Sequence, residues 1–347
     1  MESSNEASYA ELKGLIQQEG LLNKQPIYYT KKIALIVAML AASLAIFVIV
    51  PHIWVQILNA AFLAFVFGQV GLIMHDADHL QIFNSARKNR LCGLIAGNFI
   101  LGMSSGRWTT DHNIHHGSPN KLGIDPGIEV SVLAFCKEQA LKKRGIARFV
   151  VKYQAYFLIP LLALYGFKAR IQDVVLICMS LLGGGRYRIK IKNPRGEIFL
   201  TVAGSLIFFG LVFSLFDAWQ AILFVLVNHG LAGLYLGSIF ATNHKGMPLF
   251  DERMDFLQIQ VLTARNVKSN RLINLWMGGL NYQIEHHLFP TMPRNNLPKA
   301  REIVRAYCAK YGMSYYYETG FFRSYKEIFE HLHEVGAVLR KPVVSFP

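Results

Sequence analysis

Eight of the twelve histidines in this 347-residue sequence fall into a pattern that could bind metal. Seven lie in three short groups, His75–His79, His112–His116 and Gln283–His287, and His244 follows Asn243. Residues at i, i+3 and i+4 share one face of a helix, so each group presents two or three side chains in one direction. Neutral imidazole is a ligand for iron, copper, zinc and nickel. The spacing therefore predicts a histidine-rich metal site.

The number of imidazoles indicates two metals rather than one. A mononuclear non-haem iron centre takes about three protein ligands, which eight imidazoles exceed. Two ions with about four nitrogen ligands each fit the count better. Paired Glu-x-x-His motifs are missing from the sequence, which argues against the soluble carboxylate-bridged di-iron bundle.

The four other histidines are interpreted as ordinary residues of a membrane protein. His52, His331 and His333 are assigned to interface positions. His229 falls inside an apolar run, where a polar group is costly and often functional. A packing or hydrogen-bonding role is favoured for it over a place near the substrate.

The elements that position these histidines are predicted to be membrane-spanning helices in two hairpins. Hydrophobic residues make up 52% of the chain and charged residues 17%, and the apolar residues are clustered. A helix needs roughly 20 apolar residues to cross a bilayer. Turns are expected at Pro51-His52 and at Asp217. The predicted spans are Ile33–Val50, Ile53–Met74, Ile198–Phe216 and Trp219–Asn243.

The spans place the histidines at one membrane level, because His75 and His244 each directly follow the end of a span. Three shorter apolar stretches, Leu91–Met103, Tyr153–Phe167 and Val174–Gly185, are too short to span and are predicted to be interfacial or capping helices. Two more helices are expected in a soluble cap from their apolar periodicity. They are Lys299–Tyr311 and Tyr325–Leu339.

The distribution of cations predicts the orientation. Neither hairpin turn contains Lys or Arg, whereas basic residues crowd the other side of the spans. By the positive-inside rule, the termini and the central segment face the cytoplasm. The net charge of +14 therefore needs no nucleic acid partner. One domain is expected, divided into an N-terminal segment (1–30), a first hairpin (33–74), a cytoplasmic loop (75–197), a second hairpin (198–243) and a cytoplasmic tail (244–347).

At these residues the sequence resembles the membrane fatty acid desaturases, and specifically their front-end branch. The family carries three histidine boxes, H-x(3,4)-H, H-x(2,3)-H-H and [HQ]-x(2,3)-H-H, which here read HDADH, HNIHH and QIEHH. Gln in the first position of the last box marks the front-end branch. The surroundings are also similar, from Trp108 to His112, from Asn243 to Met247 and from Gly279 to Pro290, and so are Gln260, Arg265 and Asn266. The resemblance covers roughly residues 10–340.

The resemblance implies a di-iron enzyme that uses O2 to introduce a cis double bond into a fatty acyl-CoA or acyl-lipid. Gln283 stands where other branches have a ligating histidine, so its contact with iron is left open. The H-P-G-G haem motif of a fused cytochrome b5 domain does not occur in the sequence, so a separate ferredoxin or cytochrome b5 is expected to supply electrons. The implied iron ligands are His75, His79, His112, His115, His116, His244, His286 and His287.

Carboxylates beside the ligands are expected to orient the imidazoles and raise their basicity. Trp108 is expected either to shape the site or to anchor at the interface. Arg87, Lys88 and Arg107 are assigned to a CoA phosphate, a lipid headgroup or an acidic electron donor. The candidate carboxylates are Asp76, Asp78, Asp111 and Glu285, with Asp125 a little further away.

Two other functions remain open from the sequence. A hydroxylase or ketolase of the same membrane di-iron type would return oxygen to carbon instead of removing a second hydrogen. A metal or haem transporter, or a non-catalytic lipid-binding protein, is a different class. A transporter would be expected to place its ligands near the bilayer midplane, and here only His229 is inside a predicted span. The double-bond position, Δ5, Δ6 or Δ9, is also left open.

Overall fold

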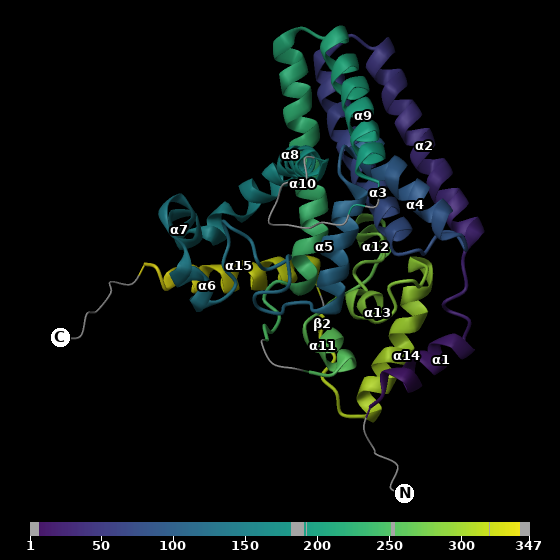
Figure 1. The fold of residues 1–347 in the computed structure, drawn as a ribbon, viewed down its shortest axis with the longest axis vertical. Helices are drawn as coiled ribbons and strands as arrows, with labels where there is room; N and C mark the ends of the chain where they lie inside the picture. Colours follow the sequence, from purple (N-terminus) through teal and green to yellow (C-terminus); the bar gives the residue numbers. More distant parts are fainter. Residues whose placement is uncertain (1–6, 182–190, 192, 251–253, 319, 341–347) are drawn as a thin grey trace, which may run out of the picture.

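The molecule has a bundle of long helices at one end and a body of shorter helices at the other (Figure 1). The computed structural model describes residues 7–181, 191, 193–250, 254–318 and 320–340. Within these ranges the fold is helical apart from one pair of two-residue strands, β1 (Asn266–Val267) and β2 (Tyr317–Glu318), which run parallel. The all-helical architecture predicted from the sequence is confirmed, and this short strand pair was not predicted.

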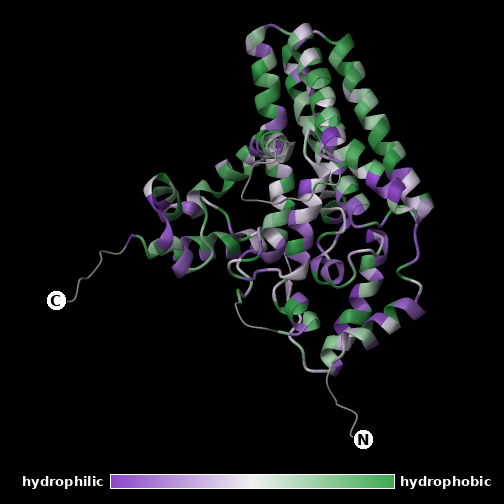
Figure 2. Cartoon of the chain, viewed as in Figure 1, coloured by the Kyte–Doolittle hydropathy of each residue, from purple (hydrophilic) through white to green (hydrophobic). Residues whose placement is uncertain are grey.

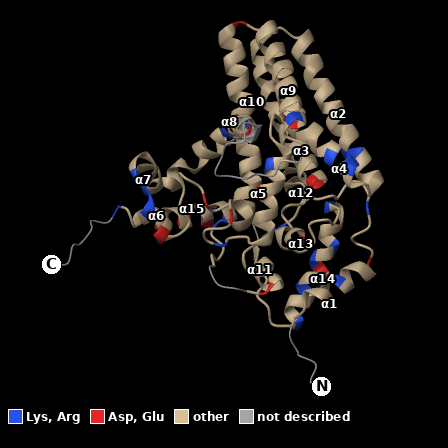
Figure 3. Cartoon of the chain, viewed as in Figure 1, with Lys and Arg blue, Asp and Glu red and all other residues tan. Residues whose placement is uncertain are grey.

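Among the residues that the structure describes, four helices are long and apolar enough to cross a membrane, as predicted. They form two hairpins, and at the second turn Asp217 and Gln220 form a reciprocal capping box. Figure 2 shows that hydrophobic residues dominate the bundle, and Figure 3 shows few charged residues along it. The four helices are α2 (Pro26–Ile49), α3 (Ile53–Asp78), α9 (Pro194–Leu215) and α10 (Ala218–His244).

One helix replaces two short ones that were predicted separately. The stretches Tyr153–Phe167 and Val174–Gly185 belong to a single helix of 28 residues, α8 (Gln154–Leu181), and residues 182–185 lie outside the described part. The charged residues between the two stretches do not break the helix, because Arg170 and Asp173 both find buried partners. α8 lies across the bundle, and it bends by 113° from α7 (Gly145–Lys152).

Glycines allow α8 to cross α10 closely. A Cβ at Gly233 would lie 2.7 Å from the carbonyl oxygens of Leu162 and Ala163. A Cβ at Gly166 would lie 2.5 Å from the carbonyl oxygen of His229. Any side chain at either position would push the helices apart, so the crossing depends on glycine in both helices.

The predicted stretch Leu91–Met103 forms a short α-helix that continues as a π-helix. α4 (Ala86–Leu94) leads into η1 (Ile95–Leu101), which ends at Gly102 with φ of +67°. η1 packs against α9, since a Cβ at Gly204 would lie 1.8 Å from the carbonyl oxygen of Phe99. The chain then enters α5 (Ser105–Gly117), which carries the second histidine group.

Shorter helices form the cap, by which we mean residues 7–25, 105–153 and 245–340 in their described parts. Its largest core joins α1, α11, α13 and α14 through residues that include Leu12, Ile284 and Val304. The two helices predicted from apolar periodicity are confirmed as α14 and α15. The remaining helices of the cap are α1 (Tyr9–Gln18), α6 (Lys137–Lys142), α11 (Phe256–Leu262), α12 (Arg271–Met277), α13 (Gln283–Leu288), η2 (Arg294–Asn296), α14 (Leu297–Lys310) and α15 (Phe321–Ala337).

Candidate metal centre

The fold brings all eight patterned histidines to one place, where the bundle meets the cap. Two spans, one cap helix and one short helix of the C-terminal region contribute them. The contributions are His75 and His79 from the end of α3, His112, His115 and His116 from α5, His244 from the last turn of α10, and His286 and His287 from α13. Histidines that are far apart in the sequence therefore form one compact group of imidazoles.

Four of these histidines form a first cluster that could hold one metal ion. In this cluster the candidate ligand nitrogens all lie within 4.8 Å of one another. His75 Nε2 lies 3.1 Å from His286 Nε2. His79 Nε2 is buried and has no hydrogen-bond partner among the described residues. The members of the first cluster are His75, His79, His112 and His286.

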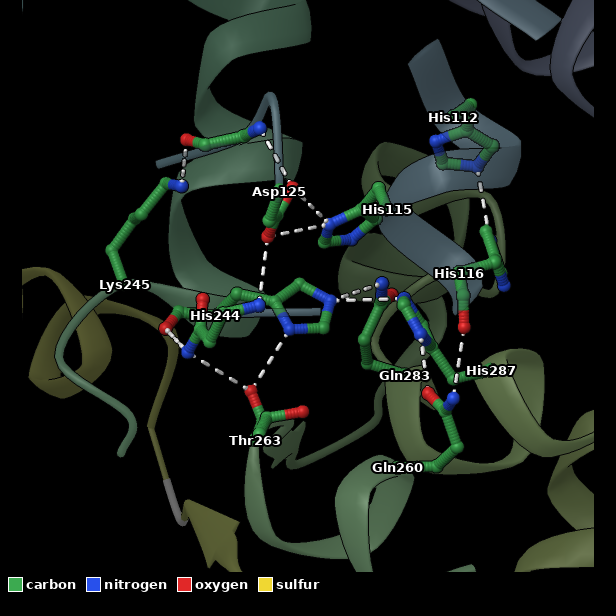
Figure 4. Close-up of polar contacts among 12 residues, drawn as sticks. His112, His115, His116, Asp125, His244, Lys245, Gln260, Thr263, Gln283 and His287 are labelled. Carbon is green, nitrogen blue, oxygen red and sulfur yellow. Dashed lines mark hydrogen bonds and ion pairs between the residues drawn. The ribbon is translucent and has the colours of Figure 1, made fainter. Parts of the chain in front are cut away.

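Three histidines form a second cluster, most of which Figure 4 shows in detail. Its members are His115, His244 and His287, again with ligand nitrogens within 4.8 Å of one another. The Nε2 atoms of His244 and His287 face each other at 3.0 Å. A second metal ion could be held here.

His116 lies between the two clusters. Its Nε2 is 3.1 Å from Nε2 of His112, a member of the first cluster. Its ring stacks on His287 of the second cluster, with ring centroids 4.0 Å apart. The eight imidazoles thus form one continuous group with two centres.

The hydrogen bonds of the Nδ1 atoms, which face away from the cluster, show that the Nε2 atoms facing into it are free to bind a cation. His244 Nδ1 donates to the carbonyl oxygen of Thr263 at 2.9 Å, and His287 Nδ1 lies 2.9 Å from Oε1 of Gln260. Both partners are oxygen acceptors, so each Nδ1 carries the proton and each neutral ring keeps a lone pair on Nε2. Two lone pairs that face each other at 3.0 Å repel unless a cation lies between them. The donor set therefore fits a metal.

Burial keeps these rings in the form that binds metal. Desolvation, reinforced by the neighbouring imidazoles, lowers the pKa of each of five histidines well below its usual value. They are neutral at physiological pH and can donate nitrogen lone pairs. The five are His79, His112, His116, His286 and His287.

Two carboxylates contact histidines directly. Asp76 Oδ1 lies 3.1 Å from Nδ1 of His75. Both oxygens of Asp125 lie 3.0 Å from Nδ1 of His115. Burial opposes the charge on Asp125, yet the bond from His115 and the backbone N–H of Asn120 hold the pKa of that carboxyl below its usual range. A carboxylate behind an imidazole fixes its tautomer and raises its basicity.

The other predicted neighbours lie elsewhere. Asp78 accepts from the hydroxyl of Ser105 at 2.8 Å, and Asp111 accepts from Arg107 at 2.8 Å on a half-exposed surface. Glu285 accepts from Asn266 at 2.6 Å and Tyr315 at 2.8 Å. None of these contacts reaches a histidine in the described part of the chain, although all three residues neighbour histidines in sequence. Neighbouring residues of a helix point their side chains to different faces, so these carboxylates point away from the adjacent histidines.

Trp108 packs against the first cluster. Its ring stacks on His112, with centroids 4.1 Å apart and planes 26° apart. It also lines a small apolar hollow where α3, η1 and α10 meet. The other lining residues are Gly71, Met74, Leu101, Met103, Leu236 and Phe240.

Gln283 lies at the edge of the second cluster. Its Oε1 accepts from Nδ2 of Asn243 at 2.8 Å, and its Nε2 lies 3.0 Å from Nε2 of His244. In this orientation the amide nitrogen, which is no metal ligand, faces the cluster.

Carboxylates from α8 and α9 hold the first turn of α5. The backbone N–H of Ser104 donates to Asp173 at 2.7 Å, and that of Gly106 donates to Glu197 at 3.3 Å. Arg107 also pairs with Asp173. Anionic side chains at a helix N-terminus satisfy its free N–H groups and complement its dipole. The helix that carries three histidines is thereby tied to the membrane bundle.

Several supporting residues were not assigned roles from the sequence. Gln260 and Thr263 accept from the outer nitrogens of His287 and His244. Arg294 pairs with Asp76. Gln260 lies in a stretch that is similar to the desaturases, but that similarity does not indicate what its side chain contacts. The sequence around Arg294 does not indicate its partner either. The remaining four histidines lie outside the clusters. His52 occupies the N-cap position of α3, and His229 stacks on phenylalanines. His331 contacts the carbonyl oxygen of Phe135, and His333 packs beside Phe329.

A four-span bundle with two histidine clusters under it defines a membrane protein with a possible di-metal site, and comparison with known proteins gives the family. Residues 50–319 match the family model described as "Fatty acid desaturase". The chain belongs to the fatty acid desaturase family, whose members are oxidoreductases that introduce double bonds into acyl chains.

Individual relatives agree with this assignment. The chain is 32% identical over 321 residues to an acyl-lipid (9-3)-desaturase of Physcomitrium patens, covering 88% of this chain and 58% of the relative. It is 29% identical to the Delta(5) fatty acid desaturase fat-4 of Caenorhabditis elegans, covering 97% of this chain and 76% of the relative. It is 30% identical to fatty acid desaturase 3 of Bos taurus, with 88% and 67% covered. The front-end resemblance is confirmed by relatives of the Δ5, Δ6 and Δ8 types.

Proposed function

We propose that this chain is an oxygen-dependent fatty-acyl desaturase with two iron ions at the histidine clusters. The observation that carries the proposal is the pair of adjoining clusters whose Nε2 lone pairs converge, at 3.1 Å for His75 and His286 and at 3.0 Å for His244 and His287. Family membership supports the reaction class, and the two histidine clusters support the binding of two metal ions.

The clusters support a specific assignment of ligands. The first iron is held by His75, His79, His112 and His286, and the second by His115, His244 and His287. His116 completes the set from its position between them. Gln283 lies beside the second iron, where the hydrogen bond that Asn243 donates to its Oε1 holds it.

The bound irons, with O2 and two electrons, supply an oxidant strong enough to remove hydrogen from an unactivated methylene. The chain contributes position and environment. Asp76 and Asp125 orient one imidazole in each cluster. Trp108 and the small apolar hollow beside it line the approach of the acyl chain to His112 and exclude water.

The substrate and partners follow from the relatives and from the charge pattern. The substrate is an acyl-CoA or acyl-lipid, and the new cis double bond lies toward the carboxyl end, as the Δ5, Δ6 and Δ8 names of relatives support. A separate ferredoxin or cytochrome b5 delivers the electrons. The cap faces the cytoplasm by the positive-inside rule. The domain is a single one with the two hairpins and cap described above.

Expression in a host of defined fatty-acid composition tests the activity. The expected result is a new cis-unsaturated fatty acid, whose double bond is located by mass spectrometry after derivatisation. The His115→Ala variant should give no product, whereas His52→Ala, at an exposed helix start, should give the product of the unmodified chain. A folded, iron-loaded chain that yields no product beside an active electron donor would contradict the proposal.

Iron analysis tests the ligand assignment separately. The purified chain should hold about two irons, given about four ligands for each. His79→Ala and His287→Ala remove one member of each cluster, and each should lower the iron content. Unchanged iron in both variants would contradict the assignment.

A further inference from the structure

Arg170 is a buried cation of α8 that has no acidic partner in the described part of the chain. It is 8% exposed, and its guanidinium donates to the carbonyl oxygen of Leu101 at 2.9 Å and to the hydroxyl of Ser205 at 3.3 Å. Its Nε has no hydrogen-bond partner, and no carboxylate of the described residues pairs with it. An unpaired buried charge costs several kcal/mol unless a counter-charge accompanies it.

A second polar side chain lies beside the same aromatic rings. His229 of α10 is 5% exposed, and neither ring nitrogen has a hydrogen-bond partner among the described residues. Phe208 and Phe209 lie 5.5 Å and 5.2 Å from the Arg170 guanidinium. The same two rings lie 5.4 Å and 6.1 Å from the ring of His229. Two polar side chains that each keep at least one nitrogen without a hydrogen-bond partner among the described residues therefore flank one aromatic wall.

An apolar groove on α8 and α9 leads to this place. It includes Ser205, which contacts Arg170, and Phe209, which contacts both polar groups. Val202 and Leu206 in its wall are among the large apolar side chains that are exposed along α9. The complete lining is Val174, Thr201, Val202, Ser205, Leu206, Phe209 and Gly210.

We propose that Arg170 binds the phosphate of a bilayer phospholipid whose acyl chain lies in this groove. Arginine forms charge-assisted hydrogen bonds with phosphate, and basic pockets between membrane helices bind lipid headgroups. The exposed groove wall faces the position of lipid chains, since α9 is one of the four spans. The depth also fits, because α8 crosses the bundle on the side of the cap rather than at the hairpin turns (Figure 1). His229 adds a second hydrogen-bonding group at the same wall.

This site is separate from the metal centre but adjoins the substrate hollow. Leu101 gives its carbonyl oxygen to Arg170, and Leu101 also lines the hollow beside Trp108. A phospholipid at Arg170 thus stabilises the end of η1, which forms one wall of that hollow.

Lipid binding by the purified full chain tests the proposal, with dioleoyl phosphatidylglycerol as the probe. Native mass spectrometry should show one retained lipid on the unmodified chain, and added lipid should raise the Tm. Arg170→Met should weaken retention about tenfold or more and abolish the lipid-dependent rise in Tm. Lys168→Met, an exposed cation on the same helix, should retain both.

Two further measurements keep the test decisive if Arg170→Met folds poorly. Val202→Trp fills the groove without touching the guanidinium, and it should also lose the retained lipid. If Arg170 only caps the Leu101 carbonyl, Arg170→Met will lower the Tm equally with and without lipid, which would overturn the proposal. Equal lipid retention by the unmodified chain and by both groove variants would overturn it as well.

A substrate arm separates bilayer lipid from acyl substrate. Oleate is offered to the unmodified chain in place of phosphatidylglycerol. The proposal expects no retained oleate. Oleate retained as strongly as phosphatidylglycerol would assign the site to the acyl substrate and overturn the phospholipid assignment.

Discussion

The guanidinium of Arg294 lies 2.9 Å from one oxygen of Asp76, while the other oxygen of Asp76 lies 3.1 Å from Nδ1 of His75. Arg294 is 4% exposed and Asp76 is 1% exposed. Burial alone would lower the pKa of the Arg294 guanidinium. The negative charge of Asp76 outweighs this effect and raises the pKa above its usual value. The chain Arg294–Asp76–His75 thus connects η2 of the cap to the end of a membrane span.

Asp76→Asn should lower the apparent iron affinity about 10- to 100-fold, the usual cost of losing the group behind a metal-binding histidine. The asparagine keeps the shape but not the charge that holds the His75 tautomer. Iron retention against a chelator series measures the effect. Asp111→Asn is the matched control, because Asp111 pairs with Arg107 and reaches no histidine among the described contacts. Equal iron loss in both variants would remove the orienting role from Asp76.

Gln283→Leu should keep the iron content of the unmodified chain while changing the spectroscopic signature of the second iron. The reason is that Gln283 Oε1 accepts a hydrogen bond from Asn243 at 2.8 Å, so the side chain packs beside the second cluster without supplying a ligand atom. Iron analysis and Mössbauer spectra measure the two effects. An iron loss as large as in His287→Ala would instead make Gln283 a ligand.

Gly71→Leu should lower desaturation about tenfold or more with no change in iron content, because the side chain enters the hollow beside Trp108. A Cβ at Gly71 already lies 2.9 Å from Cδ2 of Leu236. Gly230→Leu is the control within a span, since nothing lies within 4 Å of a Cβ there. Product yield and iron content are measured on the same preparations. Full activity in Gly71→Leu would place the acyl chain elsewhere.

Glu285→Gln should become more stable relative to the unmodified chain as pH rises. Burial raises the pKa of Glu285 to about 7, above its ordinary value of 4.5. Its contribution to stability is therefore complete below about pH 4.5 and is lost as pH rises through about 7, whereas glutamine does not titrate. The Tm difference between the two iron-free proteins should grow from pH 6 to pH 8. For the exposed Glu302→Gln the difference should stay constant, and a flat profile for Glu285→Gln would contradict the raised pKa.

The sequence predicted most of the fold because membrane spans depend on local composition. Each span is a run of about twenty apolar residues, and no distant partner is needed to recognise one. α8 was predicted as two pieces because Lys168, Arg170 and Asp173 interrupt its apolar run, and their buried partners lie in distant segments. The strand pair β1–β2 has only two residues in each strand, which is too short for a periodic signal.

The candidate site was predicted unevenly for a similar reason. Histidines in i, i+3, i+4 groups are recognisable from their spacing alone, and the structure brings all eight together. The side chains that contact these histidines are harder to recognise in the sequence. Asp78 and Glu285 neighbour histidines in sequence yet point away, whereas Gln260 reaches His287 across 27 positions. Tertiary contacts of this kind leave no mark in local spacing.

The attachment of α5 to Asp173 and Glu197 makes the metal centre sensitive to the bilayer itself. Those carboxylates belong to α8 and α9, so a change in the tilt of either helix pulls on the first turn of α5. His112, His115 and His116 then move as one rigid unit relative to the histidines of α3, α10 and α13. Membrane thickness and fluidity, which set helix tilt, thereby act on the spacing between the two histidine clusters. An enzyme that alters acyl chains in the membrane would in this way respond mechanically to the physical state its own product creates.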